Sequence, residues 1–357
     1  MIRNLVKFID KEALIHNAYL VKKSNYPSLL CAVVKSNAYG HDVATVVDTI
    51  KNIVDYFAVN DIDEALKIEK YTDKPILIIG AFNQNKLLKG ISKNIHFSVF
   101  CKKDVLKIEK IVKNTPQKCK IHIKINSGMH RLGISKQSEL DEILERIEKN
   151  PSINWVGIFT HIGSGKGKRT AKQLQIFQKF CKDLPPNIIQ HYANSETAFN
   201  YPLQPTQMAR VGISLYGYGS FLYLKPVMSI YAKVINIAFV GKGNYVGYGD
   251  KHRAKKDMQI AVLSIGYANG LMRCYEKKGW VIINNNKAKI VANICMSMTI
   301  VEVTNIKVKV GDWAIILGNS SDLQITAEDI AKKCRTISYE ILTNFSNIPC
   351  TKNKSAT

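Results

Sequence analysis

Between residues 28 and 211 short apolar runs alternate with longer polar stretches, and this alternation constrains the fold more than any other feature of the sequence. Eight runs can be counted, at residues 29–35, 56–59, 75–79, 95–99, 119–125, 153–159, 188–192 and, more weakly, 208–211. The stretches between them, such as residues 61–71, 102–113, 138–149 and 170–181, repeat apolar residues at helical spacing. Strands that alternate with helices form parallel β-α units, so eight units predict a closed (β/α)8, TIM-like barrel of the α/β class.

The pattern changes after residue 225. Strand-like runs at residues 227–239, 259–265, 280–283, 289–294, 299–303 and 314–317 are joined by G-K-G-N, K-K-G and N-N-N turns, which are typical of antiparallel hairpins. A chain of 357 residues also exceeds the usual size of a single core. We therefore predict a barrel over residues 10–224 and a mostly antiparallel β domain over residues 225–357, to which residues 1–9 can add a strand. A helix over residues 11–22, with Asp10 as its N-cap, is expected before the first barrel strand.

Composition narrows the function classes. The 51 Lys and Arg residues against 28 Asp and Glu give a formal charge of +23, which favours anionic ligands or non-specific contact with nucleic acid. The basic residues are dispersed, however, without a basic helical stripe or an aromatic platform, so most are expected on a solvated surface and a nucleic-acid-binding role ranks low. Eight scattered cysteines without a C-x-x-C pair, no export signal and no long apolar stretch predict a cytoplasmic protein with reduced thiols and no metal site.

The first apolar run ends on a lysine. Residues 29–40 read L-L-C-A-V-V-K-S-N-A-Y-G, and an unbroken apolar run suits a parallel strand that is covered on both faces. A lysine at its end either reaches water or reacts, and a desolvated amine with a lowered pKa can form a Schiff base with an aldehyde. Catalytic groups of such barrels gather at the carboxyl ends of the strands. The polar residues expected there are Lys35 at strand one, Arg131 after strand five, His161 after strand six, Asn194 and Ser195 after strand seven, and Arg210 and Gly212 after strand eight.

Seven motifs occur in order across both predicted domains: A-V-V-K-S-N-A-Y-G-H, I-N-S-G-M-H-R-L-G, A-R-V-G-I-S-L-Y-G, V-G-Y-G, S-I-G-Y-A-N-G, I-C-M-S-M and I-S-Y-E-I-L-T. Together they resemble the alanine racemase family. The resemblance implies a homodimeric isomerase that depends on pyridoxal 5′-phosphate and interconverts L- and D-alanine for peptidoglycan synthesis. It also implies a two-base mechanism, in which Lys35 carries the cofactor and serves one face of the substrate carbon while Tyr248 of the partner subunit serves the other.

The same resemblance assigns further roles. Arg210 is implied to donate to the pyridine nitrogen of the cofactor, which then stays unprotonated because a guanidinium does not release its proton. The cofactor phosphate is implied to be held by the backbone of Gly212 and Ile213, the Ser195 hydroxyl and Tyr39, with Tyr267 from the second subunit and His161 against the ring. Asn194 is included among the cofactor-binding residues. Substrate carboxylate recognition is assigned to Arg131 and the backbone N–H of Met296, Lys124 matches a lysine that the family often carbamylates, and Cys295 and Arg273 are assigned to the entrance.

Some positions depart from the family pattern. Asn269 and Ser297 replace aspartates, Asn293 replaces an arginine, Lys166 lies near an expected acid, and Lys352 stands where a carboxyl-terminal tyrosine is usual. These changes leave open a broader racemase that acts on serine or longer amino acids.

Three further classes of protein share single features with this sequence. A decarboxylase sharing the barrel would be expected to face the pyridine nitrogen with a carboxylate rather than with Arg210. A non-catalytic cofactor-handling barrel would lack the second domain. The loop at residues 163–170 superficially matches a phosphate-binding P-loop, but that motif requires glycine at Ile162 and Ser or Thr at Arg169.

Overall fold

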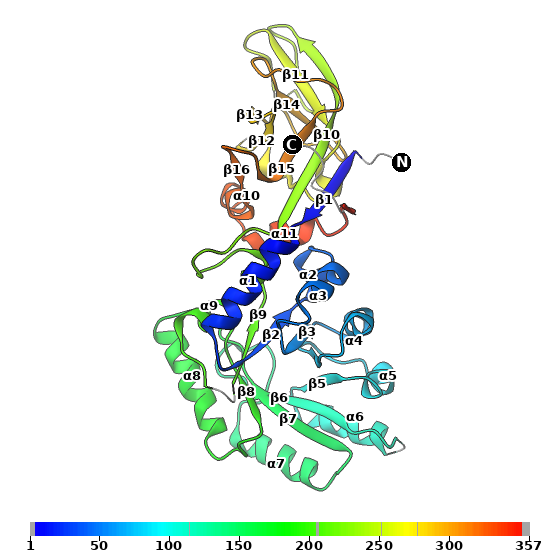
Figure 1. The fold of residues 1–357 in the computed structure, drawn as a ribbon, viewed down its shortest axis with the longest axis vertical. Coiled ribbons are helices and arrows are strands. Elements are labelled where there is room, and N and C mark those ends of the chain that lie inside the picture. Colours follow the sequence, from blue (N-terminus) through cyan, green and yellow to red (C-terminus); the bar gives the residue numbers. More distant parts are fainter. Residues whose placement is uncertain (1–3, 114, 205–206, 251, 277, 352–357) are drawn as a thin grey trace. The chain divides into compact units, whose positions relative to one another are not determined.

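The computed structural model describes residues 4–113, 115–204, 207–250, 252–276 and 278–351. The chain separates into two compact units (Figure 1). The barrel unit contains Glu12–Ala38 and Val43–Lys225, and the β unit contains Met1–Lys11, Tyr39–Asp42 and Pro226–Thr357. Within the described residues, no helix has both the length and the hydrophobicity that crossing a bilayer requires.

Eight parallel strands form the sheet of the barrel unit. They are β2 (Leu29–Val33), β3 (Tyr56–Val59), β4 (Ile76–Ile78), β5 (Ile95–Val99), β6 (Cys119–Lys124), β7 (Ile153–Phe159), β8 (Ile189–His191) and β9 (Met208–Val211). β2 pairs with both β3 and β9. A parallel bridge between Gln190 and Gln207, and a 2.9 Å hydrogen bond from the N–H of Arg210 to the carbonyl of Ala193, join the last strand to the β8 region. The ring is thus closed, and the predicted barrel is confirmed.

Helices cover the outside of this barrel (Figure 1). They include α1 (Lys11–Ser24), α3 (Val43–Ile50), α4 (Ile62–Ile68), α5 (Leu87–Ile91), α6 (Lys102–Val112), α7 (Gln137–Glu148), α8 (Lys168–Cys181) and α9 (Ser195–Asn200). The helical spacing seen in the sequence decides which face is buried, since α7 covers its side of the barrel with Leu140, Ile143 and Ile147. α4 begins after Asp61, whose carboxylate accepts the N–H of Glu64 at 3.0 Å.

The first strand is shorter than expected. The sequence predicts that it extends to Lys35, but β2 ends at Val33. Ser36 and the three residues that follow have φ angles of 54–55°, a left-handed conformation that cannot continue a strand.

The β unit is built around one long strand. β10 (Met228–Val240) pairs antiparallel with β1 (Leu5–Ile9), β11 (Met258–Leu263) and β15 (Trp313–Asn319). The remaining strands are β12 (Trp280–Ile283), β13 (Asn286–Lys289), β14 (Thr299–Glu302), β16 (Gln324–Ile325) and β17 (Cys350–Thr351), of which β17 runs parallel to β1. The predicted mostly antiparallel sheet is therefore confirmed.

Two details of the β unit differ from the prediction. The strand expected at residues 289–294 is instead β13, which starts at Asn286 directly after a two-residue turn in which Asn284 and Asn285 have φ angles of 47° and 57°. It cannot extend to residue 294, because Ala292 has a φ of 62°. The β unit also contains two helices that the sequence pattern did not predict, α10 (Ala327–Cys334) and α11 (Ser338–Asn344).

A buried lysine joins three distant segments of the β unit. Lys7, on β1, is 1% exposed, and its ammonium donates hydrogen bonds to the carbonyls of Gly40 (2.5 Å), Phe345 (3.2 Å) and Ser346 (3.1 Å). Phe345 and Ser346 follow α11, where a helix leaves carbonyl groups without partners. Burial lowers the pKa of Lys7, and the nearby Cys350 and Asp42 oppose that shift. The ammonium therefore supplies the hydrogen-bond donors that this buried end of the helix needs.

We predict that Lys7→Met lowers the free energy of unfolding by about 1–3 kcal/mol, because buried carbonyl groups lose their donor. Urea unfolding followed by circular dichroism measures the change. Lys11→Met is the matched control, since Lys11 is exposed and lies just beyond the same strand. Equal stability of the two variants would contradict a structural role for Lys7.

Candidate active site

The segment after β2 has an unusual backbone. Lys35–Tyr39, labelled α2 in Figure 1, contains Ser36, Asn37, Ala38 and Tyr39 in left-handed conformation. Each non-glycine residue in this conformation costs roughly 1–2 kcal/mol, so the turn must be stabilised from outside. The N–H of Ser36 donates to Glu64 at 2.7 Å, and the N–H of Val43 donates to the side chain of Asn37 at 2.8 Å. Backbone strain of this kind concentrates at functional sites, which singles out the start of this turn.

Lys35 stands at the start of the strained turn, where it is half-buried. Desolvation lowers its pKa, the charge of Arg131 lowers it further, and Glu64 partly opposes the shift. A lower pKa increases the fraction of neutral amine, which is the nucleophilic form. The position therefore has the chemistry that the sequence analysis expected of a reactive lysine.

The ends of neighbouring strands add more cationic groups. Burial, followed by the charges of Arg131, Arg210 and Lys35, lowers the pKa of Lys124 to about 8. His161 has its pKa lowered to about 3, again by burial first and then by the same group of cations, so it is neutral at physiological pH. Side chains that repel each other in this way form a site that a bound anion stabilises.

Arg210 is a buried cation of this group, and only 5% of it is exposed. Its guanidinium donates to the carbonyl of His191 at 2.7 Å and to the carbonyl of Thr160 at 2.6 Å, and it lies 5.2 Å from the centre of the Phe159 ring. Burial lowers its pKa to about 10, so it stays charged at neutral pH. A guanidinium has only donors, and two carbonyl groups do not neutralise its charge. The side chain can therefore serve a bound acceptor only as a donor.

Two short helices begin next to each other at the ends of β8 and β9. Asn194 caps α9 by accepting the N–H groups of Glu196 and Thr197 at 3.1 and 3.0 Å. The N–H of Gly212 donates to the Ser195 hydroxyl oxygen at 3.2 Å, which leaves the hydroxyl hydrogen to bond elsewhere. Ile213 begins the 3-10 helix Ile213–Tyr216, whose first N–H groups have no partner within the helix. These donors are of the kind that bind phosphate.

In the β unit, two of the recognised motifs interlock. The N–H of Tyr267 donates to the carbonyl of Cys295 at 3.0 Å, and the N–H of Ala268 donates to that of Met296 at 2.9 Å. Asn269 accepts the N–H of Gly266 at 3.0 Å, so its amide oxygen makes a hydrogen bond that does not need the charge of an aspartate. The sequence change at residue 269 therefore leaves this loop well formed.

Tyr248 lies on a second loop of the β unit. Gly247 and Gly249, with φ angles of 73° and 76°, flank it, and the buried side chain of Asn293 donates to its carbonyl at 3.1 Å. Tyr248 is 72% exposed, Met296 60% and Tyr267 43%. Three side chains of this size left open to solvent are suited to an interface.

The structure therefore groups the predicted residues in two sets. The barrel unit holds Lys35, Lys124, Arg131, His161, Asn194, Ser195, Arg210, Gly212 and Ile213, and the β unit holds Tyr39, Tyr248, Tyr267 and Met296. Tyr39 packs against Tyr339 with ring centres 5.8 Å apart, and burial raises its pKa. Arg273 lies 4.0 Å from Glu276, and Lys352 lies outside the described residues.

Sequence reasoning missed Glu64, which holds the strained turn, and a row of histidines inside the barrel. His96 and His122 occupy neighbouring strands, and His191 ends β8. The sequence indicates these residues only by placing a histidine within an apolar strand. Each of the three histidines, taken alone, is compatible with a purely structural role.

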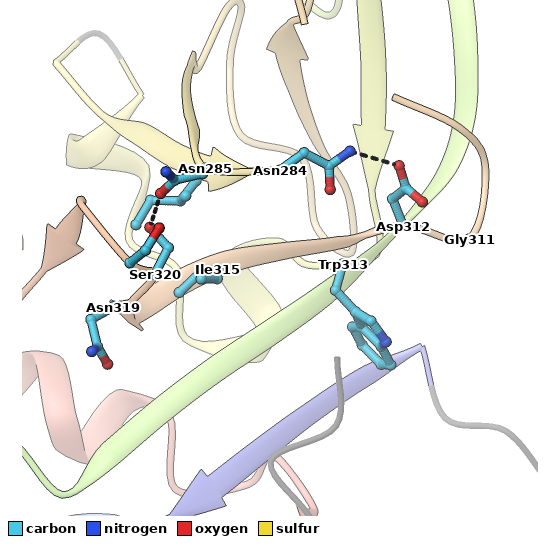
Figure 2. A pocket seen from close by; sticks show the side chains of 10 residues that line it. Asn284, Asn285, Gly311, Asp312, Trp313, Ile315, Asn319 and Ser320 are labelled. Carbon is cyan, nitrogen blue, oxygen red and sulfur yellow. Dashed lines mark hydrogen bonds between the residues drawn. The ribbon is translucent and has the colours of Figure 1, made fainter. Parts of the chain in front are cut away.

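A pocket of about 670 Å³ also lies in the β unit, between the β12–β13 turn and β15 (Figure 2). Figure 2 shows that its polar side chains bond to each other, with Asn284 donating to Asp312 at 3.0 Å and the Ser320 hydroxyl donating to Asn285 at 2.6 Å. Its lining contains no lysine or arginine among the described residues. The cationic cluster of the barrel is therefore the better candidate for a site that binds anions.

Comparison with known proteins agrees with this geometry. A family model described as the alanine racemase N-terminal domain matches residues 9–220, and one described as the alanine racemase C-terminal domain matches residues 227–350. A relative named alanine racemase, from Vesicomyosocius okutanii, is 36% identical over 345 residues and covers 95% of each chain.

Solved structures show the same relationship. The alanine racemase from E. faecalis superposes with a TM-score of 0.92 at 26% identity, covering 98% of both chains. The Bacillus anthracis alanine racemase with bound L-Ala-P superposes with a TM-score of 0.89 at 28% identity, covering 97% of this chain and 94% of that one. Because both family models match and together span almost the whole length, the chain belongs to the alanine racemase family of isomerases.

Proposed function

We propose that this protein is a cytoplasmic, homodimeric racemase that interconverts L- and D-alanine with pyridoxal 5′-phosphate and supplies D-alanine for peptidoglycan. The observation that carries the proposal is Lys35, a desolvated lysine with a lowered pKa at the start of a strained turn and close to Arg131. Membership of the family adds the substrate, since the relatives are named alanine racemases and one of them binds L-Ala-P.

The donor set fits the cofactor. A phosphate dianion suits the Ser195 hydroxyl and the backbone of Gly212 and Ile213, with Tyr39 and Tyr267 as further ligands. Arg210 would face the pyridine nitrogen as an obligate donor, with His161 and Asn194 beside the cofactor and Lys35 as the covalent attachment. When bound, the cofactor supplies an electron sink for the carbanion that proton removal creates.

The protein residues carry out the proton transfers. Lys35, as the neutral amine that its lowered pKa favours, accepts the proton on one face of the substrate carbon, and the Tyr248 phenol of a second copy donates on the opposite face. Arg131 and the Met296 N–H bind the substrate carboxylate, so the carbon is held between the two groups. The reverse direction uses the same residues with their proton states exchanged.

Exposure of the β-unit residues supports shared active sites. Tyr248, Tyr267 and Met296 are all open to solvent in the single chain. An exposed phenol is a poor proton donor for a buried carbon, because water competes with it at every step. Burial against a second subunit removes that water, which is why we propose the homodimer as the active form.

The two-base proposal predicts distinct effects for two variants. Lys35→Ala abolishes both the visible absorbance of the bound cofactor and racemisation. Tyr248→Phe keeps the absorbance and slows racemisation by roughly 10²–10⁴-fold in both directions, the range for loss of a general acid or base, while exchange of the substrate α-proton with solvent is lost from one enantiomer only. The measurement is an absorption spectrum combined with assays of racemisation and of α-proton exchange in deuterated water, each starting from L- and from D-alanine. If Tyr248→Phe kept full activity in both directions, the assignment of Tyr248 would be wrong.

We also propose that Lys124 is carbamylated. Only a neutral amine reacts with carbon dioxide, and with a pKa lowered to about 8 the neutral fraction of Lys124 increases as the pH rises through that value. The carbamate replaces a cation close to Arg131 with an anion, which removes a repulsion. We expect a carbamate signal in ¹³C NMR with labelled bicarbonate that is lost below pH 7 and in Lys124→Gln. Lys120→Gln on the same strand is the control, and a bare amine at Lys124 at pH 9 would contradict the proposal.

Alanine is expected to be the preferred substrate. The sequence observation that favours a broader racemase is Lys352, which stands where the family resemblance places a tyrosine that narrows the site. We predict that kcat/KM for alanine exceeds that for serine, lysine and arginine by at least about tenfold, a ratio that one or two additional side-chain atoms can produce in a fitted pocket. Comparable values across this panel would favour the broader enzyme.

A further inference from the structure

Inside the barrel, three histidines form a continuous hydrogen-bonded chain that ends on Arg210. The Arg210 guanidinium contacts His191 Nδ1 at 2.8 Å, His191 Nε2 lies 2.8 Å from His122 Nδ1, and His122 Nε2 lies 3.0 Å from His96 Nδ1. All three rings are buried, with His96 the most exposed at 2%. The chain therefore crosses from β9 to β5 inside the barrel.

The direction of this chain follows from the arginine. A guanidinium only donates, so His191 Nδ1 must accept and, in the neutral ring, Nε2 must carry the hydrogen. His122 Nδ1 then accepts from His191, and its Nε2–H donates to His96. His96 Nδ1 accepts in turn, which leaves its hydrogen on Nε2. Every N–H in the chain therefore points away from Arg210.

The charge state of the rings agrees with this assignment. Burial and Lys120 lower the pKa of His96 to about 3. For His122 and His191 burial is again the largest cause, and Arg210 and the neighbouring histidines lower the pKa further. Neutral rings have one donor and one acceptor each, which is what a one-way chain requires.

The chain ends on a donor that has no acceptor. His96 Nε2 is buried and has no hydrogen-bond partner among the described residues, while the Tyr56 ring packs edge-on at 5.5 Å. Reversing the chain would give this nitrogen an acceptor role, but Arg210 forbids the reversal because it cannot accept. His96 is thus needed as the acceptor for His122, even though its own hydrogen is left unbonded.

We propose that His96 is a positioning residue for Arg210, acting through His122 and His191. A ring that donates from Nε2 becomes a stronger acceptor at Nδ1, so each link strengthens the one before it. The Nδ1 of His191 then holds one arm of the guanidinium firmly and orients its remaining N–H groups. The inference rests on the proposed function, in which those groups face the cofactor nitrogen.

The test compares His96→Phe with His96→Gln in the holoenzyme. Phenylalanine cannot accept the His122 N–H, whereas the side-chain oxygen of glutamine can. We expect ¹⁵N NMR of labelled histidines in the wild type to show Nδ1 bare and Nε2 protonated in both His122 and His191. His96→Phe should shift the His191 ring signals and reduce kcat for alanine by roughly three- to tenfold with KM nearly unchanged. His96→Gln should restore both.

Three results would overturn the inference: a hydrogen on Nδ1 of His122 or His191 in the wild type, His191 signals that do not respond to His96→Phe, or a His96→Gln variant that behaves like His96→Phe. The wild-type spectrum needs no variant, so it tests the direction of the chain even if His96→Phe fails to fold. Absence of alanine racemisation by the wild-type holoenzyme would refute the proposed function instead, and it would leave the NMR assignment of the chain unaffected.

Discussion

In this protein, backbone carbonyl groups accept the hydrogen bonds of the buried cations. The charge of the candidate active site depends on this arrangement. Arg210 donates to the carbonyls of His191 and Thr160, as Lys7 does to those of Gly40, Phe345 and Ser346 in the other unit. Carbonyl dipoles stabilise a cation without cancelling its charge. At Lys7 the charge remains internal to the fold. At Arg210 it acts on Lys124, whose pKa is lowered first by burial and then by the charges of Arg131, Arg210 and Lys35.

The barrel could be predicted because each of its strands is buried on both faces. Such strands appear as unbroken apolar runs, and all eight runs coincide with observed strands to within about two residues at each end. The β unit was harder. Its two helices, α10 and α11, have eight and seven residues, too few to show a clear helical spacing of apolar residues. The strand expected at residues 289–294 was wrong because Ala292 has a φ of 62°, which a run of apolar residues does not reveal.

The site could be located from sequence, but its physical basis could not. The sequence shows that Lys35 ends an apolar run. It does not show the backbone strain of the turn that follows, because Ser36, Asn37 and Ala38 include no glycine to indicate a left-handed conformation. Glu64 stabilises that turn from a helix 28 residues away along the chain. The histidine chain was likewise hidden, since strand register decides whether His96 and His122 meet, and register depends on the closed ring.

The residues that depart from the family pattern keep hydrogen bonds within their loops but change the charge of the site. Asn269 accepts the N–H of Gly266, and Asn293 donates to the carbonyl of Tyr248, so both loops keep their internal bonds with uncharged side chains. Ser297 and Asn269 each remove a negative charge where the family has aspartate, while Asn293 removes a positive one. On balance these changes make the site more positive, in a chain that already carries +23. Alanine and serine are neutral zwitterions, whereas lysine and arginine carry a net positive charge, so a more positive site disfavours the two cationic amino acids.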